Sequence, residues 1–144
     1  MGSKGRVLVV DDEPAIRALV TKIVERAGYP VVSARDGAEA IEKLESDDYS
    51  VVVLDLMMPN VDGYSLIEYI KASSSRRPAI IVISAGDTAA LRRLDGSVVH
   101  SILRKPFDID VLGDLIAAAA RTMEEEAADA AREVLPFRKT DAVC

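Results

Sequence analysis

Three aspartates, a serine and a lysine each follow a short apolar segment of this sequence. They are Asp11 and Asp12, Asp55, Ser84 and Lys105. Taken singly, each has an ordinary structural explanation, such as a helix cap, a turn or a solvated surface. Carboxylates that lie close together, however, repel one another unless a proton or a hard cation neutralises them, and oxygen ligands favour Mg²⁺ or Ca²⁺. If the fold gathers these side chains, they predict a divalent-cation site suited to phosphate chemistry.

Five strands alternating with five helices are expected to position these side chains. The expected strands are residues 6–10, 31–34, 50–55, 79–83 and 98–103. The expected helices run from Pro14 to a stop at Gly28, from the capping pattern 36–39 through Leu44, around 66–70, over 88–94, and from Asp108 onward. Because the first, third and fourth strands are apolar without alternation, they predict a parallel sheet with helices on both faces. Ligands of such sheets bind beyond the carboxyl ends of the strands, where the polar residues stand.

Length and composition limit the classes to which the protein can belong. The 144 residues predict one domain with a core of its own, and the single cysteine, Cys144, excludes an internal disulfide and a cysteine-based metal site. No apolar segment approaches the about eighteen residues that span a membrane, and no signal peptide is recognisable, so a soluble, cytoplasmic protein is expected. The net charge of −6 gives no general attraction to phosphate backbones, and direct nucleic-acid binding is therefore not expected.

Four segments, taken in order and spacing, resemble one known family. They are Val-Val-Asp11-Asp12-Glu13-Pro14, Val-Leu-Asp55-Leu-Met-Met-Pro59-Asn-Val-Asp62-Gly63, Ile-Ser84-Ala85 and Lys105-Pro106-Phe107. The pattern is similar to the receiver (CheY-like) domain of two-component response regulators and covers about residues 5–122. Residues 123–144 would then form a helical extension and tail. The resemblance implies a flavodoxin-like α/β fold, a doubly wound parallel sheet of five strands in the order 2-1-3-4-5.

The resemblance also implies roles for single residues. Asp55 matches the phosphoacceptor, Asp11 and Asp12 match the acidic pair that binds Mg²⁺ with it, and Met57 matches the position whose backbone carbonyl completes the metal shell. The chain would accept a phosphoryl group on itself, with slow self-dephosphorylation, and would not act as an enzyme on a separate substrate. Its implied partners are a sensor histidine kinase or phosphotransfer protein and an unknown downstream protein.

Two further positions match the family pattern, and one departs from it. Ser84 matches the switch hydroxyl, and Lys105 matches the family's lysine, with a cis peptide bond to Pro106. Ile102 stands where the family usually has an aromatic residue that moves together with the hydroxyl, so that coupled movement is not implied here. His100 lies nearby and is interpreted as a surface residue of an edge strand.

Other functions remain open at this point. A phosphohydrolase with an aspartate nucleophile would need a second acid two residues later, where Met57 stands. A flavin or nucleotide binder would need a Gly-rich or Ser/Thr-rich loop after the first strand, where three acidic residues would repel phosphate. A receiver-like binding module that acts without phosphorylation, and a receiver fragment of a longer DNA-binding regulator, are the remaining alternatives.

Two expectations concern particular segments. Met57 and Gly86 stand where rapidly hydrolysing family members tend to have a polar side chain that orients water, so a long-lived phosphorylated form is expected. The last helix is expected to run from Asp108 to about Leu135, roughly 40 Å, and to mediate dimerisation or partner docking rather than form a solvated tail. Its apolar stripe comprises Leu112, Ile116, Ala119, Met123, Ala127, Ala130 and Val134.

Overall fold

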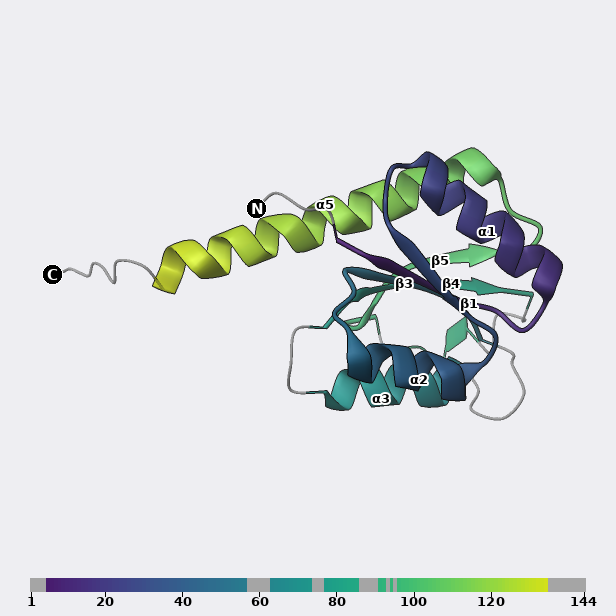
Figure 1. Ribbon diagram of the computed structural model, residues 1–144, viewed down its shortest axis with the longest axis horizontal. Coiled ribbons are helices and arrows are strands. Elements are labelled where there is room, and N and C mark those ends of the chain that lie inside the picture. Colours follow the sequence, from purple (N-terminus) through teal and green to yellow (C-terminus); the bar gives the residue numbers. More distant parts are fainter. Residues whose placement is uncertain are drawn as a thin grey trace, which may run out of the picture.

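The computed structural model describes residues 5–56, 63–73, 77–85, 91–92, 94 and 96–134, with side chains through residue 129 (Figure 1). Its strands are β1 (Val7–Val10), β2 (Val31–Ala34), β3 (Val51–Asp55), β4 (Ala79–Ser84) and β5 (Val99–Arg104). Its helices are α1 (Pro14–Arg26), α2 (Gly37–Ser46), α3 (Gly63–Ala72) and α5 (Ile109–Val134). The expected helix at 88–94 lies largely outside the described residues.

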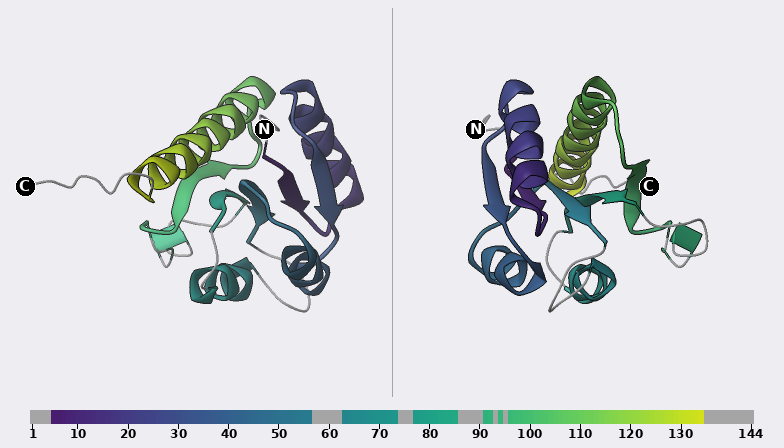
Figure 2. Two further views of the ribbon diagram at one scale, coloured as in Figure 1. Left: turned by 60° about the vertical axis from the view of Figure 1, so that its left-hand side comes forward. Right: turned by 90° about the vertical axis from the view of Figure 1, so that its right-hand side faces the viewer.

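The five strands form one parallel sheet in the order β2-β1-β3-β4-β5, as expected. Helices α1 and α5 cover one face, and α2 and α3 cover the other (Figure 2). The three central strands are buried along their whole length because both of their faces are covered, which explains their uninterrupted apolar sequence. All five strands therefore direct their carboxyl ends to one rim.

Alternate residues of each strand feed two separate layers of the core. In β1, Val7 and Val9 pack toward α1 and α5, whereas Leu8 and Val10 pack toward α2 and α3. This division follows from the two-residue period of a strand, which sends successive side chains to opposite faces. The polar residues that follow β1 and end β3 are thus held by strands that pack against helices on both faces.

Local sequence signals begin and end the helices near the rim. Glu13 is the N-cap residue of α1, and Pro14 takes the first helical position, where a missing N–H costs little. The helix ends at Arg26, just before the expected stop at Gly28, whose φ of 94° belongs to the left-handed region that glycine tolerates. At the start of α2, the Asp36 carboxylate accepts from the Glu39 N–H at 2.8 Å, and the Glu39 carboxylate accepts from the Arg35 N–H at 2.7 Å.

Helix α5 is continuous over Ile109–Val134, close to the expected span. Asp108 caps it, since its Oδ1 accepts hydrogen bonds from the N–H groups of Asp110 and Val111 at 2.8 and 3.2 Å. The first half of α5 packs against the sheet, whereas the second half extends beyond the sheet (Figure 1). Among the α5 side chains that the structure describes, through residue 129, the fully buried ones lie in that first half and are Leu112, Ile116, Ala119 and Ala120.

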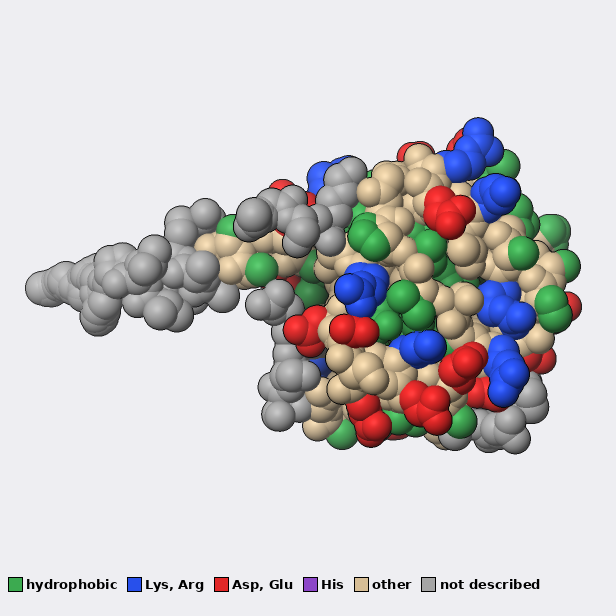
Figure 3. Space-filling model, in the orientation of Figure 1, with side chains coloured by type: hydrophobic (Ala, Val, Ile, Leu, Met, Phe, Trp, Pro, Cys, Tyr) green, Lys and Arg blue, Asp and Glu red, His purple; other side chains and the backbone are tan. Residues whose placement is uncertain are grey.

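The surface is mixed in charge. On the face seen in Figure 3, acidic and basic side chains are interspersed, and no broad area of a single sign is visible among the described residues. Within the same described part of the chain, no helix has the length and apolar character needed to cross a membrane.

Candidate phosphoacceptor and metal site

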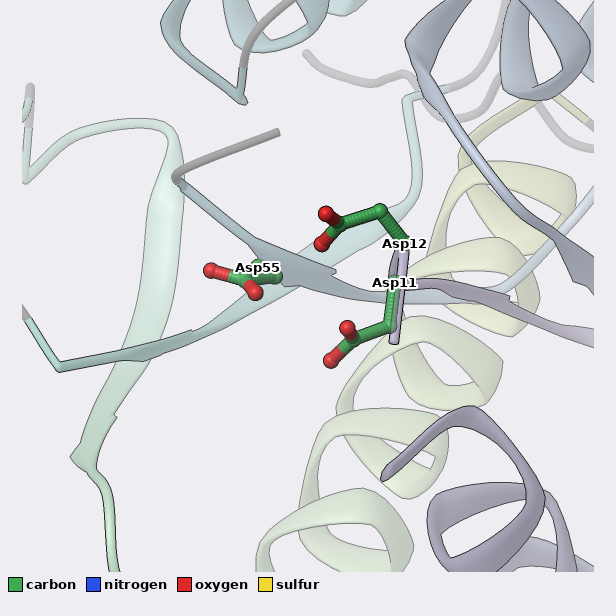
Figure 4. Close-up of side chains that lie close together, drawn as sticks. All are labelled: Asp11, Asp12 and Asp55. Atoms are coloured by element: carbon green, nitrogen blue, oxygen red, sulfur yellow. The ribbon is translucent and has the colours of Figure 1, made fainter. Parts of the chain in front are cut away.

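Three carboxylates meet at the carboxyl rim of the sheet. Asp11 and Asp12 directly follow β1, and Asp55 ends the neighbouring strand β3. One oxygen of each lies within 4.8 Å of the others, and the three side chains point to the same side of the rim (Figure 4). Asp11 is only 3 % exposed and Asp55 only 5 %. The structure thus brings together the three aspartates that the sequence proposed as metal ligands.

Lys105 reaches this cluster from the connection between β5 and α5. Its Nζ donates to Asp55 Oδ2 at 3.1 Å and lies 3.8 Å from Asp11 Oδ2, and its side chain is 17 % exposed. The peptide bond to Pro106 is cis, as expected. One cation therefore faces at least two carboxylates in a setting with little water.

Ser84 lies at the carboxyl end of β4, beside β3. It comes directly after Ile83, the register partner of Asp55, and it is fully buried. Its carbonyl oxygen accepts from the Lys105 N–H at 3.0 Å, which ties the ends of β4 and β5 together. The fold therefore gathers Ser84 and Lys105 at the rim that carries Asp55. Met57, the remaining expected metal ligand, lies outside the described residues.

Hydrogen bonds within the connection from β1 to α1 orient Asp11. Its Oδ1 accepts from the Glu13 N–H at 2.9 Å, its carbonyl oxygen accepts from Arg17 Nη1 at 2.7 Å, and its own N–H donates to the Ala34 carbonyl at 3.1 Å. These contacts immobilise the backbone that carries the acidic pair. The role of Arg17 was not expected, because a basic residue in the first turn of a helix carries no signal for a contact with the preceding strand.

Burial and neighbouring groups shift the pKa values of both Asp11 and Lys105. Burial raises the pKa of Asp11 to about 6, helped by the neighbouring charges of Asp55 and Asp12 and opposed by the Glu13 N–H and by Lys105. Burial by itself would lower the pKa of Lys105, but hydrogen bonds to Asp55 and Glu13 outweigh it and raise that pKa. The three carboxylates thus carry more negative charge than the Lys105 ammonium offsets.

A glycine allows α3 to start directly behind the phosphoacceptor candidate. The Gly63 N–H donates to the Leu56 carbonyl at 2.9 Å, and a Cβ at position 63 would lie 2.5 Å from Leu56 Cα. Leu56 itself is fully buried. The chain beyond Asp55 is therefore held by a backbone contact that tolerates no side chain at position 63.

Two positions near the expected switch lie on the outer side of β5. The side chains of β5 alternate between partly buried and exposed, and both Ile102 and His100 are exposed. The exposed His100 agrees with its interpretation as a surface residue of an edge strand. Ile102 is one of the large apolar side chains on the surface of the described residues.

Comparison with known proteins agrees with this geometry. The family model described as the response regulator receiver domain matches residues 7–117. The transcriptional regulatory protein TcrA of Mycobacterium tuberculosis is 32 % identical over 117 residues, which cover 81 % of this chain and 46 % of TcrA. The response regulator MprA of the same species is 35 % identical over 127 residues, covering 86 % of this chain and 54 % of MprA. The chain thus spans about half the length of these two relatives.

The similarity extends to solved structures. The response regulator protein TrrA from Thermotoga maritima, crystallised in complex with Mg(2+)-BeF, superposes with a TM-score of 0.71 at 30 % identity. The superposition covers 80 % of this chain and 98 % of that one. The family model and the superposition with TrrA each cover most of this chain.

Proposed function

Because this chain belongs to the family of response regulator receiver domains, we propose that Asp55 accepts a phosphoryl group in a two-component signalling system. The observation that carries the proposal is the position of Asp55, buried beside Asp11 and Asp12 with Lys105 Nζ 3.1 Å from its Oδ2. A buried aspartate with its own cation and two further carboxylates is equipped to react with an anionic donor only once the excess negative charge is neutralised.

The proposed step is a displacement at phosphorus. An oxygen of the Asp55 carboxylate forms a bond to the phosphorus atom, and the bond between phosphorus and the donor breaks. The leaving group departs with that electron pair; with a small acyl phosphate as donor, it is a carboxylate and needs no proton. Lys105 then donates to a phosphoryl oxygen, and its 17 % exposure keeps this contact strong because little water screens it.

The residues present suit a magnesium ion. Asp11, Asp12 and Asp55 supply oxygens close enough to share one cation, and the backbone carbonyl of Met57 is the proposed fourth protein ligand. When bound, Mg²⁺ would neutralise charge on the carboxylates and on the transferring oxygens. The charge balance supports this part of the proposal, because the three carboxylates carry more negative charge than the Lys105 ammonium beside them can offset.

Signalling would follow from movement around the new phosphoryl group. We propose that the Ser84 hydroxyl donates to a phosphoryl oxygen after the loop that follows β4 moves inward, and that this changes the protein surface near β5. The proposed donor is a sensor histidine kinase or phosphotransfer protein in the cytoplasm, and the proposed output is contact with another protein. Residues 5–122 would form the receiver domain, and residues 123–144 would form the extension. The phosphorylated receiver would lose its phosphoryl group slowly.

The extension carries a separate proposal for assembly. Beyond Met123, which packs against the core, α5 projects from the domain, and we propose that this part mediates dimerisation or partner docking. Sedimentation of the full chain and of a version that ends after Met123 tests the dimer. Equal monomer masses at high micromolar concentration, with and without phosphorylation, would contradict it.

Intact-mass measurement with acetyl phosphate tests the main proposal. We expect one added phosphoryl group in the presence of Mg²⁺, none after chelation, and none in Asp55→Asn. The exposed Asp48 provides the matched control, and Asp48→Asn should be phosphorylated as the parent is. Uptake that persists in Asp55→Asn would assign the reaction to another residue and contradict the proposal.

A further inference from the structure

The side chain of Glu13 points away from the helix that its backbone begins. Glu13 is the N-cap residue of α1 with extended backbone dihedrals, φ −89° and ψ 114°, yet its carboxylate makes no capping hydrogen bond. Instead, its Oε1 accepts from Lys105 Nζ at 3.1 Å, across 92 positions of sequence. This carboxylate therefore joins the connection after β1 to the connection after β5, on the solvent side of the aspartate cluster.

The contacts of Lys105 divide between two kinds of partner. An ammonium has three hydrogens, and two of them are directed to Glu13 and Asp55, each at 3.1 Å. Asp11 lies at 3.8 Å, close enough for attraction but too far for a hydrogen bond. Glu13 is 59 % exposed, whereas Asp55 is nearly buried. The hydrogen bond from Lys105 to Asp55 must change when phosphorus bonds to the Asp55 carboxylate. The hydrogen bond from Lys105 to Glu13 can remain.

From this arrangement we propose that Glu13 is a positioning residue, which tethers the Lys105 ammonium over the site before and during phosphoryl transfer. The inference rests on the proposed function of Asp55. When an Asp55 oxygen takes up phosphorus, Lys105 moves one hydrogen bond from Asp55 to a phosphoryl oxygen, while Glu13 holds the other. Glu13 touches neither donor nor phosphorus and acts through Lys105 alone.

A simple effect of charge would give a different result from a tether. Glu13 adds one negative charge near an entrance that an anionic donor must approach, so removing that charge should help the donor to bind. Glu13→Gln removes the charge but keeps the length and an accepting oxygen. Glu13→Asp keeps the charge but is shorter by one methylene, and aspartate is a favoured N-cap residue that would turn toward the N–H groups of α1. The two variants therefore separate the effect of side-chain length at position 13 from the effect of its charge.

The rate of phosphorylation of the full chain by acetyl phosphate, with Mg²⁺ and over a range of donor concentrations, provides the first measurement. For Glu13→Asp we expect the maximal rate to fall about two- to fivefold, the range open to an ion pair with one exposed partner, at an unchanged half-saturating concentration. For Glu13→Gln we expect a smaller fall in maximal rate and a lower half-saturating donor concentration. Glu25→Gln removes the same charge from an exposed position near the other end of α1 and should match the parent.

NMR spectroscopy of the lysine ammonium groups provides a readout that a purely structural role would not move. In the unphosphorylated parent, the Lys105 ammonium should be less mobile and exchange its hydrogens more slowly than exposed lysines, and Glu13→Asp should reduce that difference, leaving the part that the hydrogen bond to Asp55 supplies. A maximal rate for Glu13→Asp equal to that of the parent, or an unchanged Lys105 signal, would overturn the inference while leaving the proposed function intact. A parent that takes up no phosphoryl group would overturn the proposed function itself, and the inference with it.

Discussion

Replacing Asp11 with asparagine should stabilise this protein in metal-free buffer near pH 8. Asp11 is 3 % exposed and lies beside two further carboxylates, so its negative charge is disfavoured in the folded state. Asparagine has nearly the same shape, carries no charge, and keeps an oxygen that can accept from the Glu13 N–H at 2.9 Å. The substitution therefore removes the unfavourable charge while keeping the hydrogen bond that orients the loop.

The size of the effect follows from the shifted pKa. Burial raises the pKa of Asp11 from 3.8 to about 6, and one pKa unit corresponds to about 1.4 kcal/mol, which gives a penalty of the order of 3 kcal/mol when Asp11 is ionised. The variant also loses the attraction of Lys105 Nζ at 3.8 Å, so a net gain of about 1–3 kcal/mol is expected. For a domain of this size that gain corresponds to a rise in Tm of roughly 3–10 °C.

The sign of the pH dependence provides a second check. The folded state binds a proton at Asp11 more tightly than the unfolded chain does, so Asp11 lets the parent gain stability as the pH falls from 8 through 6 toward about 4. Asp11→Asn lacks this gain. The difference in stability between variant and parent should be largest above pH 7 and small near pH 4.

Thermal and urea unfolding in the presence of a chelator, at several pH values between 4 and 8, measures this difference. Asp48→Asn serves as control, since Asp48 is exposed and should give no comparable gain. Adding millimolar Mg²⁺ should stabilise the parent and narrow the difference at pH 8, because the variant lacks one of the proposed ligand carboxylates. A variant that is less stable than the parent at pH 8 without metal, or a difference that does not vary with pH, would refute the electrostatic account of the cluster.

Three further outcomes are expected. Mg²⁺ at ten times its Kd should stabilise the unphosphorylated parent by about 1.4 kcal/mol, and Asp12→Ala should abolish that gain; a Tm indifferent to millimolar Mg²⁺ would contradict the metal site. Gly63→Ala should lower the free energy of unfolding by about 1–3 kcal/mol, because the added methyl meets the Leu56 backbone, whereas Gly96→Ala meets nothing within 4 Å and should be nearly neutral; equal effects of the two would contradict the backbone contact. The phosphorylated parent should be long-lived and Met57→Asn should shorten its lifetime, measured as decay after donor removal; a parent lifetime of seconds that the substitution leaves unchanged would count against this.

The sequence by itself determined the arrangement of elements and the rim where polar residues gather. Uninterrupted apolar segments at β1, β3 and β4 require cover on both faces, and alternation with helices makes the strands parallel. Parallel strands end at one rim, so Asp11 and Asp55 could be expected on the same side of the sheet before any distance was known. Helix boundaries followed in the same way from Pro14, Gly28 and Asp108, because capping depends on neighbours in the chain.

Only the tertiary structure decided which of these polar groups touch. Glu13 and Lys105 are 92 positions apart, and their contact at 3.1 Å depends on how α1 and the β5–α5 connection pack on the sheet. The pKa of Asp11 likewise depends on burial and on charges brought from other strands, and the close approach of Gly63 to Leu56 depends on where α3 docks. Contact distances between residues far apart in sequence are set, to within a few tenths of an ångström, by the packing of the whole core. No local sequence pattern encodes them.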